Sequence, residues 1–411
     1  MENPASADHA PAYPAPAYPV VRLLPKTDPR PLHRGSPWVF ANELVVDRRT
    51  GKLPPGTIAL LHDGERAPLG IVAVNPASKI ICRMLDRNPD AVIDTAWFAA
   101  RIARALALRE RLFPTPFYRL VHAEADGLPG VVIDRFGDAA VVQPNAAWAD
   151  LHLDALVAAL VQVTGVRAVV KNATGRARTL EGLDEETALI LGTLNGPVPT
   201  AMNGATYMAD LMGGQKTGLF YDQRPNHAFA ASLAKGARVL DMFCHVGGFA
   251  LAALAAGADR ALAVDGSAPA LDLAGQGAAA GGMTERFTTR RGDAFDVMGE
   301  LATEGAQFEV VICDPPAFAP NKATLEAGVR AYERVARLAA PLVAPGGYLA
   351  LCSCSHAVDL TRFRAACNSG IGRAGRAAQL IHTGFAGPDH PQLPQLAESG
   401  YLKALFYRLD G

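Results

Sequence analysis

The feature that most constrains the fold is an alternation of strand-length apolar runs with alanine-rich, helix-length segments after about residue 204. The apolar runs are RVLDMF (238–243), RALAVD (260–265), FEVVICD (308–314) and GYLALCSC (347–354). Strands that alternate with helices form a parallel sheet covered on both faces, and ligands bind outside the carboxyl ends of its strands. Residues 204–411 are therefore predicted to form a Rossmann-like α/β domain with its site at these strand ends.

The chain before residue 204 divides into three further segments. Residues 1–19 are rich in Pro and Ala and are predicted to be a disordered tail. Residues 20–92 contain short β-branched runs broken by Gly and Pro, which predict a small β-barrel or β-rich module. Residues 93–203 begin with a linker helix that Asp94 can cap and Pro114 stops, and continue as a strand–strand–helix–strand–strand unit.

Composition and charge exclude some classes of protein. No apolar run reaches the roughly 18–20 residues of a membrane helix, and the first residues lack the layout of a signal peptide, so a cytoplasmic location is expected. The six cysteines and the histidines show no metal-binding spacing, so no metal is predicted. The net charge is −1, but residues 20–90 carry eleven Lys/Arg against seven Asp/Glu. This basic excess suits contact with phosphates, or simply a solvated surface.

Four strand ends carry candidate ligand-binding groups. Asp241 ends one strand, and the turn through Gly247 and Gly248 lets the backbone approach a ligand. Asp265 ends the next strand, where an acid can accept hydrogen bonds from ribose hydroxyls, and Asp293 in a Gly-Asp-Ala turn could address adenine. A dinucleotide enzyme would need a GxGxxG series for the pyrophosphate, but positions 243 and 245 are Phe and His. A ligand without phosphates, such as S-adenosylmethionine, fits better.

The motifs together give a specific resemblance. LDMFCHVGGFALAA, LAVDGSAPAL, RGDAF, VVICDPPAF and LCSCS occur in this order, and TGLFYDQRPNH precedes them. In these motifs the chain resembles the bacterial, PUA-containing, S-adenosylmethionine-dependent rRNA cytosine-5 methyltransferases. HRGSPWVF resembles that family's N-terminal PUA domain, and AEADGLPGVVIDRFGD resembles its central domain. The resemblance extends over nearly everything from residue 20, including DHP at 389–391 and YLKALF at 401–406.

The resemblance implies a fold, a cofactor and partners. The fold is a class I methyltransferase sheet at 204–411, preceded by a PUA-like, RNA-binding β-barrel at 20–92 and a small α/β domain of the EEHEE type at 93–203. The cofactor is S-adenosyl-L-methionine, the RNA partner is 23S rRNA, and the family suggests a homodimer. Phe220, Asp222 and Arg224 are implied to help hold the cofactor, with the arginine near its methionine carboxylate, for which a guanidinium is a suitable partner.

The expected site residues form three sets. The cofactor-binding set is Phe220, Asp222, Arg224, Asp241, Cys244, Gly247, Gly248, Asp265, Asp293 and Asp314. The substrate-binding set is Pro315, Pro316, Phe318, Arg34 and Trp38. The catalytic pair is Cys354 and Asp314. The thiols of Cys244 and Cys313 are expected to be structural.

A cysteine is needed because carbon 5 of cytosine is a poor nucleophile. A thiolate that adds to carbon 6 raises the electron density at carbon 5 and divides one hard reaction into two easier ones. Strand alternation allows Cys352 and Cys354 to share a face and does not choose between them, whereas the family pattern aligns its nucleophile with Cys354. Asp314 is expected to act as a general acid at N3, and Phe318 to stack on an extruded base.

Some assignments stay open. Related RNA cytosine methyltransferases carry a second cysteine after the proline of the aspartate motif, but Ala317 stands there, so the base that removes the carbon-5 proton is not identified. His245 and His356 could modulate the thiol, and Lys403 could face the site or be solvated. The alternatives are N-methylation of an RNA base, a nonenzymatic RNA-binding or ribosome assembly factor, and, with least support, a small-molecule methyltransferase.

Overall fold

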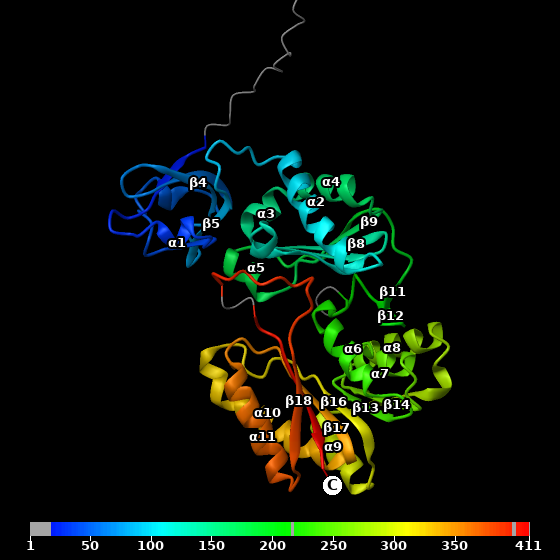
Figure 1. The fold of residues 1–411 in the computed structure, drawn as a ribbon. Helices are drawn as coiled ribbons and strands as arrows, with labels where there is room; N and C mark the ends of the chain where they lie inside the picture. Colours follow the sequence, from blue (N-terminus) through cyan, green and yellow to red (C-terminus); the bar gives the residue numbers. More distant parts are fainter. Residues whose placement is uncertain (1–17, 215–217, 397–399, 411) are drawn as a thin grey trace, which may run out of the picture.

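The computed structural model describes residues 18–214, 218–396 and 400–410, which form three regions along the chain (Figure 1). The predicted disordered tail at 1–19 lies outside the described residues, apart from Tyr18 and Pro19. The hydroxyl of Tyr18 accepts a hydrogen bond from the N–H of Ile93, and the carbonyl of Pro19 accepts one from Leu60. No described helix combines the length and the apolar character needed to span a membrane.

The N-terminal region is a closed β-barrel. Its strand order is β1–β3–β4–β5–β2, parallel between β1 and β3 and antiparallel elsewhere. An antiparallel bridge between Leu23 and Leu44 joins the segments after the two edge strands, so the sheet closes on itself. The strand and helix bounds are β1 (Val20–Arg22), α1 (Arg30–His33), β2 (Trp38–Phe40), η1 (Thr50–Lys52), β3 (Thr57–His62), β4 (Pro68–Val74) and β5 (Ile80–Asp86). This confirms the predicted β-barrel.

The central region packs helices on a mixed sheet of order β10–β9–β8–β7–β6. The linker helix α2 (Thr95–Leu112) begins where Asp94 accepts a hydrogen bond from the N–H of Trp97, and it ends two residues before Pro114. The other bounds are β6 (Phe117–His122), η2 (Ala123–Asp126), β7 (Val131–Phe136), β8 (Ala139–Pro144), α3 (Ala147–Leu151), α4 (Leu153–Thr164), β9 (Ala168–Lys171), α5 (Arg176–Glu181) and β10 (Ala188–Leu191).

The central unit differs in one respect from the EEHEE pattern. Three strands, β6, β7 and β8, precede its helices, because DGLPG and FGD each reverse the chain, with Gly127, Gly130 and Gly137 at positive φ. The single helix of the predicted unit is also divided, into α3 and α4, at His152.

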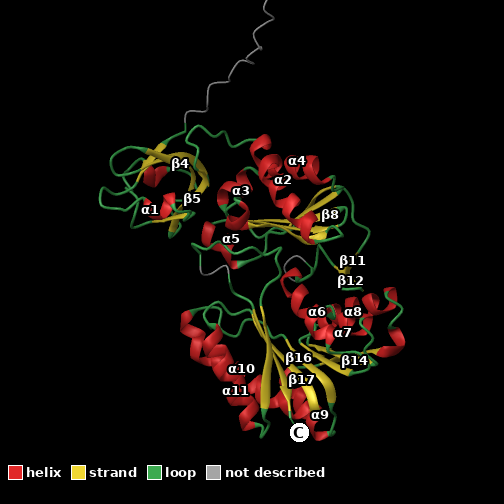
Figure 2. Cartoon of the chain, viewed as in Figure 1, coloured by secondary structure: helices red, strands yellow, loops and turns green. Residues whose placement is uncertain are grey.

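The C-terminal region is a sheet with helices on both faces (Figure 2). Its strand order is β15–β14–β13–β16–β17–β19–β18, and all its pairs are parallel except the two that β19 forms with β17 and β18. Its bounds are η3 (Tyr221–Gln223), α6 (Arg224–Ser232), β13 (Arg238–Met242), α7 (Gly248–Ala255), β14 (Arg260–Asp265), α8 (Ala268–Ala280), η4 (Thr284–Arg286), β15 (Phe287–Arg291), α9 (Ala294–Thr303), β16 (Phe308–Cys313), η5 (Lys322–Thr324), α10 (Leu325–Ala339), η6 (Ala340–Leu342), β17 (Val343–Ser353), α11 (Leu360–Arg373), β18 (Ala378–Gly384) and β19 (Lys403–Leu409).

Two apolar cores hold this sheet between its helices. Val239 of β13 belongs to the core under α6, α7 and α8, whereas its neighbour Leu240 belongs to the core under α9, α10 and α11. Strand order reverses at β13, between β14 and β16, and such a switch point forms the ligand crevice of open α/β sheets. The topology therefore places the candidate site at the carboxyl ends of β13, β14 and β16.

A β-hairpin lies across the predicted boundary between residues 203 and 204. β11 (Val198–Met202) pairs with β12 (Ala205–Ala209), and Tyr207 of β12 is fully buried in the core shared with α7 and α8. We therefore place the domain boundary before Val198.

The segment between β18 and β19 returns to the central region, as Figure 1 shows in red. The guanidinium of Arg109, which is fully buried, pairs with Asp126 at 2.6 Å and donates to the carbonyl of Asp389 at 2.9 Å. The backbone N–H of Arg119 donates to the Asp389 carboxylate at 3.1 Å. Buried charges require such partners, so these contacts join the central region to the segment between β18 and β19.

Candidate active site

The loop between β13 and α7 has an unusual backbone. Phe243, His245 and Gly247 have φ values of +61°, +50° and +80°. Left-handed φ is uncommon for non-glycine residues and is often found at ligand sites, where the surrounding fold maintains it. The carboxylate of Asp265, at the end of β14, accepts hydrogen bonds from the N–H of His245 at 2.9 Å and of Ser267 at 2.8 Å. Asp265 therefore holds this loop in place.

Gly248 is required by a close approach of His227. A Cβ at this position would lie 2.8 Å from the imidazole, which packs against Phe249 at a ring distance of 4.4 Å. Burial lowers the pKa of His227 to about 3, so the ring is neutral. Cys244 is also buried and its thiol lies 3.6 Å from the carbonyl oxygen of His245, in line with the structural role expected for it.

Asp241 is a buried acid at the end of β13. One carboxylate oxygen accepts a hydrogen bond from the N–H of Ala250 at 2.9 Å, and the other has no hydrogen-bond partner among the described residues. Burial raises the pKa of this carboxyl to about 7, against the effect of helix N–H groups that favour the charged form. Asp293, by contrast, is exposed and caps α9 through the N–H groups of Phe295 and Asp296.

The segment before α6 contains Phe220 and Asp222, and it contacts the loop between β13 and α7. The ring of Phe220 lies 4.9 Å from that of His245. One oxygen of the buried Asp222 carboxylate accepts a hydrogen bond from Tyr401 at 2.5 Å, and the other has no partner among the described residues. Tyr401 precedes β19 and was not predicted as a site residue.

Arg224 points elsewhere. Its guanidinium lies over the ring of Phe113 at 4.3 Å and donates to the carbonyl of Phe117, both in the central region. The structure thus gives Arg224 an interdomain contact, and the expected contact with the cofactor carboxylate stays a prediction. No local pattern signals this, because the two partners are more than a hundred residues away in the sequence.

The segment Asp314–Phe318 follows β16. Asp314 is half-buried, and its N–H donates to the carbonyl of Met242 at 3.3 Å, which joins this segment to the end of β13. Pro315 is buried and Pro316 is exposed. The ring of Phe318 is half-buried, and its centroid lies 5.0 Å from that of Tyr332 and 6.2 Å from that of Phe295. Part of this ring therefore packs against the core below α10.

Cys354 follows the last residue of β17. It is half-buried, whereas the other five cysteines are buried. Cys352 is fully enclosed in the sheet, and burial holds the pKa of its thiol well above the ordinary value, which suits an inert structural cysteine. The structure therefore distinguishes the two thiols that strand alternation could not.

Ser355 ties the turn at Cys354 to the segment that follows Asp314. The hydroxyl of Ser355 accepts a hydrogen bond from the N–H of Ala319 at 3.0 Å and bonds to the hydroxyl of Tyr332 at 2.8 Å. Within the turn, the hydroxyl of Ser353 accepts from the N–H of Ser355 at 3.3 Å. The sequence motif pointed to the cysteine, but it did not reveal that Ser355 joins the two segments.

Comparison with known proteins identifies the family. Residues 150–408 match the model of the S-adenosylmethionine-dependent methyltransferase family, and residues 21–87 match a PUA-like domain. The chain belongs to the S-adenosylmethionine-dependent methyltransferases. Its cofactor is S-adenosylmethionine.

Relatives of this methyltransferase extend over almost its whole length. The ribosomal RNA large subunit methyltransferase I of Alteromonas mediterranea is 36% identical over 389 residues, which cover 94% of this chain and 97% of that protein. The protein of the same name from Tolumonas auensis is 35% identical over 391 residues, 94% of this chain and 98% of that protein. The crystal structure of SMU.776, a methyltransferase complexed with SAH, shares the fold with a TM-score of 0.78 at 20% identity, covering 95% of this chain and 99% of that one.

The residues of the methyltransferase site fit its cofactor. Three buried polar atoms of the site lack a hydrogen-bond partner among the described residues: Asp222 Oδ1, His227 Nδ1 and Asp241 Oδ1. The buried Nε of Arg224, whose guanidinium faces the central region, also lacks one. Buried polar atoms are normally paired, so such a group indicates a missing ligand. The two carboxylate oxygens suit the ammonium and hydroxyl groups of S-adenosylmethionine, and Asp265 keeps lone pairs for ribose hydroxyls.

Two predicted substrate-binding residues of the methyltransferase lie in its N-terminal region. The indole of Trp38 donates to Glu124 of the central region at 2.9 Å, and Arg83 pairs with the same carboxylate at 3.1 Å. Trp38 therefore makes an interdomain contact, and its role in substrate binding stays a prediction. Arg34 is exposed, and its carbonyl accepts a hydrogen bond from Gln395 at 2.7 Å.

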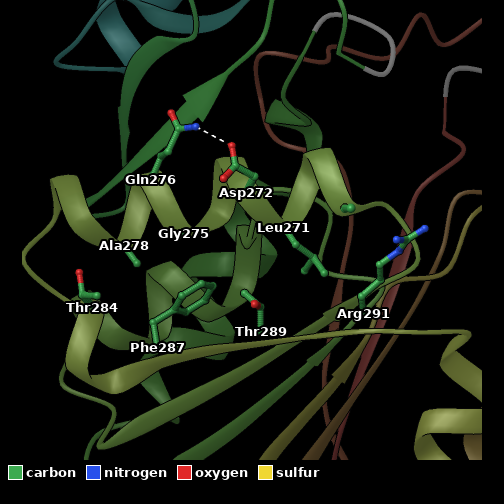
Figure 3. A pocket seen from close by; sticks show the side chains of 10 residues that line it. Leu271, Asp272, Gly275, Gln276, Ala278, Thr284, Phe287, Thr289 and Arg291 are labelled. Atoms are coloured by element: carbon green, nitrogen blue, oxygen red, sulfur yellow. Dashed lines mark hydrogen bonds between the residues drawn. The ribbon is translucent and has the colours of Figure 1, made fainter.

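A pocket of about 440 Å³ lies between α8 and β15, on the edge of the sheet (Figure 3). Asp272 and Gln276 of α8 form a hydrogen bond beside it, and Arg291 marks the end nearest the cofactor loop. None of the predicted site residues lines this pocket, which is therefore separate from the site described above.

Proposed function

We propose that this methyltransferase methylates carbon 5 of a cytosine in 23S rRNA through a covalent adduct with Cys354. The observation that carries the proposal is the placement of one half-buried thiol after β17, on a turn that Ser355 ties to the Asp314–Phe318 segment. The names of the relatives support large-subunit rRNA as the substrate. The N-terminal PUA-like domain supports an RNA partner.

Cys354 and Asp314 act on different atoms of the cytosine ring. The thiolate of Cys354 forms a bond to carbon 6, and the electron pair of the 5,6 double bond moves to carbon 5 while Asp314 donates a proton to N3. The bound cofactor supplies an electrophilic methyl group that carbon 5 accepts. Loss of the carbon-5 proton to a base, departure of the thiolate from carbon 6 and return of the N3 proton to Asp314 restore the aromatic ring. The departing thiolate leaves Cys354 ready for another turnover.

Pro315 and Pro316 form a rigid turn beside the expected position of the base edge. Proline fixes φ, so the carboxyl of Asp314 keeps one orientation toward the pyrimidine. An extruded base needs a flat apolar surface, and the half-buried ring of Phe318 offers one edge of such a surface. Asp314 also borders the end of β13, so the acid lies between the cofactor loop and the cysteine turn.

The test combines product identification with trapping. Incubation with 23S rRNA and labelled cofactor, followed by nucleoside mass spectrometry, is expected to yield 5-methylcytidine. RNA containing 5-fluorocytidine should form a complex that survives denaturing gels, because fluorine at carbon 5 blocks the final elimination.

The control separates the two neighbouring thiols. Cys354→Ala should abolish product and trapped complex, whereas Cys352→Ala, which removes the enclosed thiol of the same strand, should retain both. Full methylation by Cys354→Ala, with the label on a ring or amino nitrogen, would assign N-methylation instead. Failure to bind the cofactor in calorimetry would leave an RNA-binding protein without this activity.

A further inference from the structure

Lys403 is a buried lysine beneath the turn that carries Cys354. It begins β19 and pairs with Ser353 of β17, and only 5% of its surface is exposed. Its ammonium donates hydrogen bonds to the carbonyl of Ser355 at 2.8 Å and to that of Val358 at 2.7 Å. The ammonium therefore spans both ends of the segment that follows the cysteine.

Burying an ammonium costs free energy, and the backbone pairing of β19 at this position does not require a lysine side chain. Removing an ammonium from water costs several kcal/mol unless partners compensate. Two carbonyl oxygens compensate in part. Burial lowers the pKa of Lys403, and the interaction with Cys354 acts in the opposite direction. A cation and a thiolate stabilise each other reciprocally, so the same interaction favours the charged form of Cys354.

The other ionisable groups around this turn come from several elements. Tyr332 faces it from α10 and Tyr401 from the segment before β19, and burial raises the pKa of both phenols, so both are neutral. Asp359 caps α11 and is exposed, and it favours the charged form of Lys403. His356 lies in the turn itself, with its ring 5.3 Å from that of Tyr401, and Asp314 lies on the facing segment. Among these groups, Lys403 is the buried amine that hydrogen-bonds to this turn, and its interaction with Cys354 favours its charged form.

We propose that Lys403 is a positioning residue whose ammonium fixes the turn at 355–358 and stabilises the thiolate of Cys354. The inference deepens the proposed function, since it assumes that this thiol is the nucleophile. A thiolate is the reactive form of cysteine, and reactive cysteines lie beside a cation or a helix N-terminus. Lys403 thus supplies the charge, and the serines supply the geometry.

The test is the pH dependence of Cys354 alkylation by iodoacetamide, followed by peptide mass spectrometry without RNA. The wild-type thiol is expected to titrate below the ordinary value of about 8.5. Lys403→Met keeps the length and apolar stem of the side chain and removes the charge. It should slow alkylation at pH 7 about tenfold, the effect of one pKa unit, and move the pH profile of methyl transfer to higher pH. Lys403→Arg should restore most of the rate.

Calorimetric binding of S-adenosylmethionine shows whether each variant keeps its fold, and Cys354→Ala gives the background from the other thiols. An unchanged alkylation profile in a folded Lys403→Met protein would overturn the proposal. If Lys403→Met does not fold, the wild-type titration decides, and an inflection at or above about 8.5 overturns the proposal. A low titration without 5-methylcytidine in any RNA would instead retain this inference and reject the proposed function.

Discussion

Asp241→Asn tests whether the buried, charged carboxylate of Asp241 destabilises the enzyme when no cofactor is bound. The folded protein raises the pKa of Asp241 from 3.8 to about 7, chiefly by burial. Between these values the folded state retains a proton that the unfolded state has lost. The contribution of this carboxyl to stability is therefore largest below pH 3.8 and falls as the pH rises to about 7.

The magnitude follows from the size of the pKa difference. Each pH unit over which only the unfolded carboxyl has lost its proton costs about 1.4 kcal/mol, and the slope halves at pH 7, so the stability that Asp241 contributes falls by about 2 kcal/mol between pH 5 and pH 7. Asparagine has the same shape and does not titrate. The unliganded variant should therefore gain about 2 kcal/mol relative to the wild type over this interval. The same change should weaken cofactor binding about tenfold or more, because a hydrogen bond to a charged group contributes about 1.5–3 kcal/mol.

Hydrogen exchange of peptides that cover β13 is the appropriate assay, after correction for the intrinsic exchange rate at each pH. The three tryptophans, Trp38, Trp97 and Trp148, lie outside the catalytic sheet, so their fluorescence does not report on its opening. Asp293→Asn is the matched control: asparagine caps a helix as well as aspartate, and this carboxyl is exposed. A constant difference in opening free energy between Asp241→Asn and wild type from pH 5 to pH 7 would refute the reasoning.

Three further substitutions test contacts within the site and in the central region. Ser355→Ala removes the hydroxyl that joins the two catalytic loops, and it should lower kcat while leaving cofactor affinity within about twofold, at a stability loss of about 1–3 kcal/mol measured by thermal unfolding. Gly248→Ala places a methyl group 2.8 Å from His227, and calorimetry should show weaker cofactor binding, whereas RNA affinity in filter binding stays the same. Arg109→Met leaves the Asp126 carboxylate buried without its partner, and urea unfolding followed by circular dichroism should show a loss of about 3–5 kcal/mol, which a second change, Asp126→Asn, should partly recover.

The sequence was sufficient for features that follow from local order. The alternation of apolar strands and helices predicted the doubly wound sheet, and the predicted acids at 241 and 265 lie at its strand ends because parallel strands place their carboxyl ends on one edge. The cap at Asp94 and the stop at Pro114 gave the limits of α2 for the same reason: each acts on its own helix end. The strand–strand–helix–strand–strand pattern predicted for the central unit lacks one strand, because the segments on both sides of DGLPG and of FGD form strands.

Residues that act across domains could not be assigned in this way. Trp38 next to Arg34 has the composition of an RNA contact, yet its hydrogen-bond partner Glu124 lies 86 residues further along the chain. Arg224 sits in a motif typical of cofactor binding, and only the packing of the central region shows where its guanidinium points. Lys403 could be solvated or buried until the strand order placed β19 inside the sheet.

That strand order has a consequence for biosynthesis. β19 comes last among the strands but occupies an interior position, between β17 and β18. A ribosome-bound chain that has emerged only as far as Cys354 exposes an open sheet edge and lacks the cation that the thiol is proposed to need. The thiol of Cys354 therefore gains its proposed cation only after β19 has been synthesised and has paired between β17 and β18. Newly made enzyme would thus avoid premature oxidation or stray alkylation during the interval when it is most accessible.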